Sequence, residues 1–263
     1  MKQTLACLII DDPLLIPRYG NLDYEKLLAE MQEHNFFTEI AFIPWNYRRS
    51  DPRTVKLFKE NPDHYAICVH GCDHTGNEFG TSDSDELDLL VHTALWRMDR
   101  HEALTGLRYD PVIVFPQGKF SAPALKALKD AGFQAAFNSH VSAVGDTVPE
   151  CKDPASTHYS GFPVFQRRYP KDREKFREDV KNGRPVLVVQ HPGDFRNGYQ
   201  GITDLVDRIN DLAEIKWTSL SNVAEHYGYK RNGTVGIKPS FDLPRNIKTG
   251  IRRFLCEARD YLR

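Results

Sequence analysis

Hydrophobic and polar positions follow two rhythms along the chain. Short apolar runs alternate with longer stretches in which apolar residues recur every three or four positions. The short runs are typical of buried strands, and the longer stretches are typical of amphipathic helices. The predicted strands cover 4–11, 37–43, 65–69, 111–115, 135–137, 162–165, 186–190 and 216–218. The predicted helices cover 21–32, 51–60, 84–104, 121–131, 172–181, 201–213 and 219–227.

This alternation of strands and helices predicts an α/β fold with about seven parallel strands. The simplest arrangement of such units is a (β/α) barrel, here distorted or incomplete. The chain of 263 residues is long enough for one large domain with a full core, which we place at 1–229. Residues 139–162 read as one long loop, which predicts a functional rim or lid.

The last segment, residues 230–263, differs in composition from the rest. It carries nine Lys and Arg residues against three acidic ones. The pattern predicts an arm followed by a basic helix over about 246–262. This helix either packs on the domain with a solvated basic face or contacts a partner or an anionic surface.

The overall composition excludes several classes of protein. The net charge is -1, so no global excess of positive charge favours nucleic acid as a partner. No apolar run approaches the roughly 18 residues of a membrane span, so we expect no transmembrane segment, and Asp11-Asp12 interrupts the first run too early for a secretory leader. The five cysteines form no CxxC pair, which predicts reduced thiols and a cytoplasmic location.

Polar residues follow two of the apolar runs where the predicted strands end. His70 and His74 can reach one metal ion if a helical turn begins there, although one core histidine and one solvent histidine is the alternative. The pair Asp11-Asp12 is hard to explain by packing, because a buried carboxylate needs a cation or donors. We therefore expect Asp12, His70 and His74 to be metal ligands and Asp11 to be a base beside them. Cys72 is a lower-ranked ligand, because its side chain is expected to point away from the histidines.

Two further strand ends complete a possible reaction site. His191 can protonate a leaving amine or alkoxide, and N–H groups of the Gln117-Gly118 turn can hold an oxyanion. A set of two histidines and one carboxylate suits zinc, and also iron, cobalt or manganese. Such a metal lowers the pKa of a bound water and polarises a carbonyl group. The sequence therefore predicts a hydrolase of an amide or ester that depends on a divalent metal, with zinc as the first choice.

These stretches occur in the order known from one enzyme family. Ile10-Asp11-Asp12 matches its first motif, and the His-x-x-x-His of 70–74 matches its second. Residues 114–118 resemble the third motif, and Val189-Gln190-His191 resembles the last. Over about residues 4–220 the chain thus resembles the polysaccharide deacetylase family, also called the NodB-homology family or carbohydrate esterase family four. The resemblance implies a distorted (β/α) barrel, Asp11 as the general base, His191 as the catalytic acid and a metal on Asp12, His70 and His74.

The chain departs from the family's pattern at two positions, and its fourth motif is not identified. Pro13 stands where a glycine usually follows Asp-Asp, and Val114 replaces an arginine that steadies the base aspartate. Another cation is then needed beside Asp11. The sequence offers three candidates that it does not rank, Arg97, Arg167 and Arg168.

The expected substrate is a small molecule or a glycan. Trp45 and Asn46 follow a predicted strand, and an exposed aromatic there suits stacking on a sugar ring, although it can equally plug the barrel rim. The sequence favours removal of an acetyl or similar acyl group from an N- or O-acetylated sugar. One alternative is a catalytically silent carbohydrate-binding or assembly protein, which Val114 favours. The other is the same site acting on a non-sugar amide.

Overall fold

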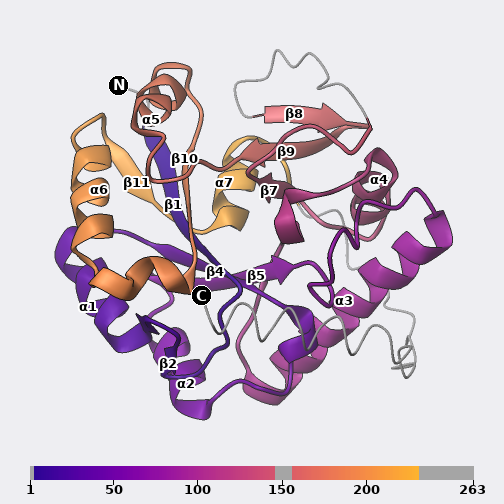
Figure 1. The fold of residues 1–263 in the computed structure, drawn as a ribbon, viewed down its shortest axis with the longest axis horizontal. Helices are drawn as coiled ribbons and strands as arrows, with labels where there is room; N and C mark the ends of the chain where they lie inside the picture. The colour runs from indigo at the N-terminus through magenta and orange to yellow at the C-terminus, as the bar shows by residue number, and fades with distance from the viewer. Residues whose placement is uncertain (1–2, 146–155, 231–263) are drawn as a thin grey trace.

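A mainly parallel sheet forms the centre of the protein, and this computed structural model describes residues 3–145 and 156–230 (Figure 1). The strands are β1 (Thr4–Asp11), β2 (Arg18–Tyr19), β3 (Leu22–Asp23), β4 (Thr38–Phe42), β5 (Tyr65–His70), β6 (Asp110–Val114), β7 (Ala136–Asn138), β8 (Ser156–Tyr159), β9 (Phe162–Gln166), β10 (Val186–Gln190) and β11 (Ile215–Trp217). The central sheet has nine strands in the order β10-β1-β4-β5-β6-β7-β9-β8, with β11 beside β1. The strands from β10 to β9 in this order all pair in parallel. The predicted α/β fold with about seven parallel strands is confirmed.

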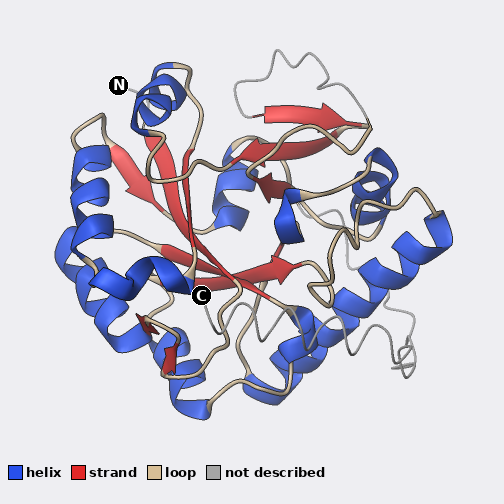
Figure 2. Cartoon of the chain, viewed as in Figure 1, coloured by secondary structure: helices blue, strands red, loops and turns tan. Residues whose placement is uncertain are grey.

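Helices surround the strands, as Figure 2 shows. They are α1 (Tyr24–His34), α2 (Pro52–Glu60), α3 (Ser84–Thr105), α4 (Ala122–Asp130), α5 (Arg173–Lys181), α6 (Gln200–Asn210) and α7 (Leu220–His226). The helices α1 and α6 lie together on one side of the sheet, and α3 and α4 lie together on the other. Side-chain caps define several starts, since the Asp51 carboxylate accepts from the Arg53 N–H and the Asp83 carboxylate accepts from the Asp85 N–H.

One residue joins the two ends of the parallel array. Arg168, which follows β9, forms a parallel bridge with Val188 of β10. Its N–H donates to the Leu187 carbonyl at 2.8 Å, and its carbonyl accepts from the Val189 N–H at 2.9 Å. This single bridge replaces a full strand ladder, so the barrel is incomplete, as the sequence predicted.

The strands separate two buried apolar clusters, and this separation sets the direction of the polar side chains at their ends. Ala6, Leu8 and Ile10 pack with the outer helices, whereas Leu5, Cys7 and Ile9 face the barrel interior. Helix α7 closes this interior with its own apolar side chains. Because side chains alternate along a strand, the residue that continues the inward row of β1 is Asp11.

The same alternation holds on β9. Val164 belongs to the outer cluster, and Phe165 belongs to the inner one. The next inward position is therefore Arg167, whereas Arg168 belongs to the outer face. These two neighbouring arginines consequently have different surroundings.

Two short hairpins were not expected from the sequence. The predicted loop 139–162 contains β8, which pairs antiparallel with β9 through a turn at Ser160 and Gly161, both with positive φ. The strands β2 and β3 form the other hairpin, next to β1 in the chain. The three strands β2, β3 and β8 were not predicted because they are short and contain polar residues. No helix in the described part of the chain is long and apolar enough to cross a membrane. The basic helix predicted over 246–262 lies outside the described residues.

Candidate metal centre and active site

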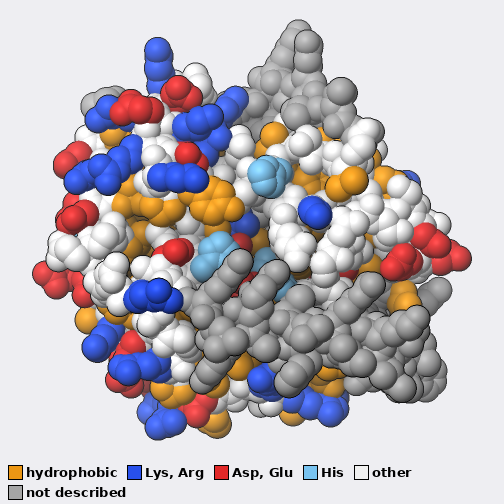
Figure 3. Space-filling view, viewed as in Figure 1, with side chains coloured by type: hydrophobic (Ala, Val, Ile, Leu, Met, Phe, Trp, Pro, Cys, Tyr) orange, Lys and Arg blue, Asp and Glu red, His pale blue; other side chains and the backbone are white. Residues whose placement is uncertain are grey.

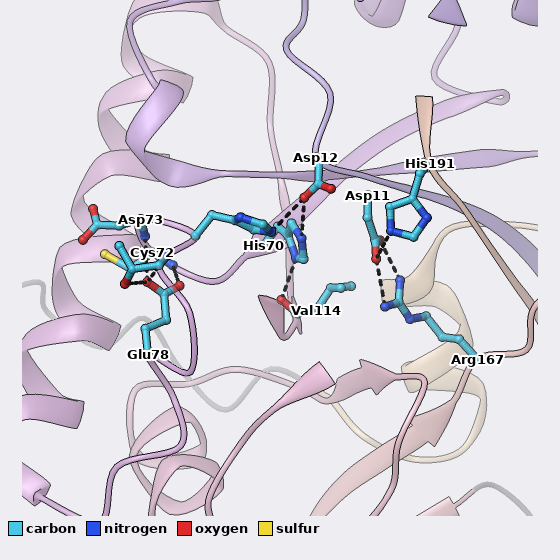
Figure 4. Close-up of polar contacts among 11 residues, drawn as sticks. Asp11, Asp12, His70, Cys72, Asp73, Glu78, Val114, Arg167 and His191 are labelled. Atoms are coloured by element: carbon cyan, nitrogen blue, oxygen red, sulfur yellow. Dashed lines mark hydrogen bonds and ion pairs between the residues drawn. The ribbon is translucent and has the colours of Figure 1, made fainter. Parts of the chain in front are cut away.

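Asp12, His70 and His74 come together at the carboxyl ends of β1 and β5 (Figure 4). Asp12 Oδ1 lies 3.0 Å from His70 Nε2 and 2.9 Å from His74 Nε2. His70 Nδ1 lies 3.0 Å from the Val114 carbonyl oxygen, so the proton of this imidazole belongs on Nδ1. Nε2 then presents a lone pair toward a carboxylate oxygen of Asp12. Two electron-rich atoms this close together need a cation between or beside them. The donor set therefore fits a divalent metal such as zinc.

Asp12 is ionised in this environment. Burial acts to raise the pKa of its carboxyl group, but the favourable interactions with the adjacent imidazoles of His70 and His74 outweigh burial. The pKa of Asp12 is therefore held well below its usual range. The carboxylate is available as a ligand throughout the neutral pH range.

The backbone at two of the three candidate ligands is strained. Asp12 has φ +82° and His74 has φ +58°, which is the left-handed region that residues with a side chain rarely adopt. Such a conformation costs of order 1 kcal/mol or more and persists where the surroundings impose it, often at functional sites. The fold thus holds both ligands in positions that the isolated segments would not favour.

The segment that carries His74 is an irregular loop organised by one carboxylate, so the two histidines come together without the helical turn considered from the sequence. Glu78 accepts hydrogen bonds from the N–H groups of Cys72 at 2.8 Å, Asp73 at 3.1 Å and Thr75 at 3.3 Å. Gly71 has φ +63°, and a Cβ atom there would lie 2.1 Å from Glu78 Oε1. Glycine at 71 is therefore a condition for this close approach. No local pattern in the sequence indicates this network, because it depends on how the loop folds back on itself.

Cys72 does not join the ligand group. Its side chain is buried in the outer cluster, and its sulfur lies 3.5 Å from Arg97 Nη1. The same guanidinium nitrogen donates to Asp73 Oδ1 at 2.6 Å. This buried ion pair ties the loop to helix α3, on the side away from the metal ligands.

Asp11 faces the interior of the barrel mouth, where Arg167 holds it. Arg167 Nη1 donates to Asp11 Oδ1 at 2.7 Å, and Nη2 donates to Oδ2 at 3.0 Å. Both side chains are almost fully buried, with exposures of 2% for Arg167 and 7% for Asp11. A bidentate pair of this kind fixes the plane of the carboxylate. An arginine directly after β9 thus supplies the cation beside Asp11 that Val114 on β6 cannot supply.

The other two candidate arginines have different partners. Arg97 pairs with Asp73, and Arg168 donates to Asp179 of α5 at 2.9 and 3.0 Å. The alternation along β9 explains the choice, because Arg167 points inward and Arg168 outward. The structure therefore ranks the three candidates that the sequence left open.

His191 lies beside Asp11, at the carboxyl end of β10. Its Nε2 lies 4.0 Å from Asp11 Oδ2, and its Nδ1 lies 3.9 Å from Asp194 Oδ2. The Asp194 carboxylate also accepts from the backbone N–H of His191 at 2.7 Å. The His191 side chain is 44% exposed, so it meets both the pocket and solvent. Figure 3 shows histidine side chains gathered near the middle of one face of the molecule.

The ligand group, Asp11, Arg167 and His191 line one pocket of about 210 Å³. Gln117 and Gly118 line it too, as predicted, but the Gly118 N–H donates to the Phe115 carbonyl at 3.0 Å and is not free for an oxyanion. The oxyanion role of Gln117 stays a prediction. Ser139 and Tyr169 also line the pocket, and neither was predicted from the sequence. Tyr169 continues the inward row of Phe165 and Arg167, so strand alternation was a usable signal for it.

Trp45 and Asn46 do not line this pocket. The Trp45 ring is 37% exposed and lies over the Arg97 guanidinium, 4.8 Å from ring centre to carbon. Asn46 is only 3% exposed and accepts from Arg49 Nη1 at 3.1 Å. Their predicted contact with substrate is therefore not supported by their position, and Trp45 instead covers the Arg97–Asp73 pair.

No protein family model matches the sequence, and no curated protein matches it either. Among solved structures, a Mycobacterium smegmatis protein assigned to the polysaccharide deacetylases has a TM-score of 0.56 at 17% identity, covering 91% of this chain and 96% of that one. The T48 deacetylase, solved with substrate, has a TM-score of 0.54 at 14% identity, covering 87% and 94%. A variant of the peptidoglycan deacetylase PdaC from Bacillus subtilis has a TM-score of 0.50 at 12% identity, covering 85% and 91%. The resemblance drawn from the motifs is thus confirmed in the fold, and the chain has the incomplete (β/α) barrel of the polysaccharide deacetylases.

Proposed function

We propose that this protein is a divergent member of that family and a metal-dependent hydrolase that removes an acetyl or similar small acyl group from an N- or O-acetylated sugar. One observation carries the proposal. Three metal-binding side chains, an arginine-held carboxylate and a half-exposed histidine meet in one pocket. Structural matches named as deacetylases support it. Asp12, His70 and His74 would hold the metal, for which zinc is our choice and which, when bound, lowers the pKa of water and polarises a carbonyl.

The other polar residues of the pocket have separate tasks in this proposal. Asp11 accepts the proton of the attacking water, and Arg167 keeps its carboxylate turned toward the pocket. His191 protonates the leaving amine or alkoxide from the other side of Asp11. Its exposure lets it exchange protons with solvent after each turnover.

The size of the pocket favours a short acyl group. Its volume of about 210 Å³ lies below the ~300–1,000 Å³ typical of sites that enclose a drug-sized ligand. Phe115 is the one aliphatic or phenyl side chain among the described residues that line it, so a long acyl chain would find little apolar surface. An acetyl group needs only a small volume and little apolar surface.

A catalytically silent binding protein is the second candidate. The replacement of the family arginine by Val114 was the observation in its favour. Arg167 supplies a guanidinium to Asp11 from another strand, so this observation no longer argues against catalysis. A non-sugar amide as substrate stays an alternative for the same site. The cytoplasmic location stays a prediction, supported by the free, buried thiols of Cys7 and Cys68.

The test measures zinc content and hydrolysis of a chromogenic aryl acetate together. We expect about one equivalent of zinc in the wild-type protein, none in Asp12→Ala, and hydrolysis only where zinc is bound. Asp63→Ala changes an exposed aspartate outside the pocket and serves as the control. A wild-type protein that binds no divalent metal even when it is supplied would refute the hydrolase and favour the silent binding protein.

A further inference from the structure

A larger pocket lies between helix α2 and the end of helix α3. Its volume is about 690 Å³, within the ~300–1,000 Å³ typical of sites that enclose a drug-sized ligand. Residues 47–50, α2 and the last turn of α3 line it, and none of the described residues that line it also lines the catalytic pocket. We call it the helix pocket.

Apolar side chains form the walls of the helix pocket. Leu104, in the last turn of α3, is 58% exposed, although a leucine gains free energy from burial. Pro52 and Val55 of α2 line the same pocket, and the Tyr47 ring adds to its apolar surface. A ligand with a hydrocarbon body would remove this surface from water, which favours its binding.

Three cations surround these apolar residues. Arg48, Lys56 and Lys59 line the pocket beside one acidic residue, Glu60, so positive charge is in excess among the described lining residues. The Arg48 guanidinium carbon lies 4.9 Å from the centre of the Tyr47 ring, which holds this cation at the pocket. Lys59 Nζ donates at 3.4 Å to the carbonyl of the final α3 residue and retains further N–H groups. Lys56 and Glu60 are both exposed and 3.6 Å apart, a kind of pair that contributes little.

Two hydroxyl groups add to the demand for an acceptor. Ser50 Oγ lies 2.9 Å from His101 Nε2, and His101 Nδ1 has no partner among the described residues. Burial lowers the pKa of His101 to about 4, so the ring is neutral, and its one proton belongs on Nε2, where the Ser50 oxygen accepts it. The Ser50 hydroxyl can then donate to a ligand oxygen. The Tyr47 hydroxyl is buried without a partner in the described part of the chain, which also favours an acceptor there.

We propose that the helix pocket binds an organic anion, a carboxylate on a hydrocarbon body. An excess of positive charge and donors around apolar walls matches one anionic group joined to an apolar body. The basic segment 230–263, with nine Lys and Arg against three acidic residues, does not complement the charge of this pocket. The proposed binding is independent of the hydrolase, because it requires neither the catalytic pocket nor a metal.

The test is calorimetric titration of the zinc-supplied protein with octanoate, octanol and acetate. We expect octanoate to bind at one equivalent. Octanol lacks the charge and acetate lacks the hydrocarbon body, so each should bind at least about tenfold more weakly, a difference of about 1.4 kcal/mol or more.

Two variants with matched controls locate the ligand. Arg48→Gln and Leu104→Gln change exposed residues of the helix pocket, and each should weaken octanoate binding about tenfold. Arg208→Gln changes an exposed arginine of α6, and Leu89→Gln changes a leucine of α3 that is 48% exposed. Both controls lie outside the pocket and should bind octanoate as the wild type does. Thermal unfolding of each variant checks the fold.

Several outcomes would overturn the proposal. One is the absence of octanoate binding, and another is equal binding of octanoate and octanol. Unchanged octanoate binding by Arg48→Gln and Leu104→Gln would place the ligand elsewhere, for instance at the zinc. A dimer in sedimentation that Leu104→Gln dissociates would assign the surface to a second copy of the chain instead. Hydrolysis of aryl acetate is measured separately, so a failure of this proposal is distinguishable from a failure of the hydrolase.

Discussion

The pairing of Arg167 with Asp11 makes a quantitative prediction for Arg167→Met. The substitution removes two charge-assisted hydrogen bonds, of 2.7 and 3.0 Å, and leaves a buried carboxylate without its guanidinium partner. Breaking a buried ion pair in this way costs about 3–5 kcal/mol. Part of this cost appears as lost stability, and part appears as misorientation of Asp11. General-base catalysis contributes about 10²–10⁴ in rate, so we expect kcat for aryl acetate hydrolysis to fall within that range.

Arg168→Met is the matched control, because it lies next in the chain and also loses two guanidinium–carboxylate hydrogen bonds, of 2.9 and 3.0 Å. Its partner Asp179 lies on the outer side of the barrel, so stability should fall and kcat should stay unchanged. Urea unfolding measures the stability of both variants, and steady-state kinetics measures kcat. Equal losses of kcat in both variants, or full activity in Arg167→Met, would refute the positioning of Asp11 by Arg167.

Three further predictions concern the metal loop, the acid and a buried histidine. Glu78→Gln should weaken zinc binding about 10–100-fold in a chelator competition, because its carboxylate organises the loop that carries His74; unchanged affinity would contradict this. His191→Ala should keep its zinc and lose about 10²–10⁴ in kcat, and an unchanged rate would remove its role as the acid. Burial lowers the pKa of His101 from 6.5 to about 4, so the folded state favours the neutral ring. The contribution of the neutral His101 ring to the free energy of unfolding is complete above pH 6.5. The free energy of unfolding then falls by about 3 kcal/mol, at 1.36 kcal/mol per pKa unit, as the pH drops to about 4. Urea unfolding across this range should show that His101→Gln has a flatter pH profile than the wild type, whereas a variant of exposed His226 should not.

Much of the barrel and of the metal group was predictable because both follow from local pattern. Apolar runs marked the parallel strands, and polar residues at the ends of β1 and β5 or shortly after them marked Asp12, His70 and His74. Parallel strands bring their carboxyl ends to the same edge of the sheet. The positions of these residues at strand ends were therefore enough to predict that they lie close together. The register of neighbouring strands did not have to be known.

The parts that were not predictable depend on geometry beyond the strands. The choice of Arg167 over Arg168 needed the inward and outward sides of β9, which the short run 162–165 left undefined. The loop around Glu78 and the positive φ angles at Asp12 and His74 arise from tertiary contacts, which no local propensity reports. The strands of the β2–β3 hairpin have two residues each, which is too short for an alternating pattern to stand out.

The single bridge between β9 and β10 links the integrity of the barrel to its chemistry. Arg168 closes the seam through its backbone, and the residue before it holds Asp11. A local opening of this seam would withdraw the Arg167 guanidinium while the helices and the other strands stay folded. Local openings need less free energy than global unfolding. Loss of aryl acetate hydrolysis on heating should therefore precede the loss of secondary structure.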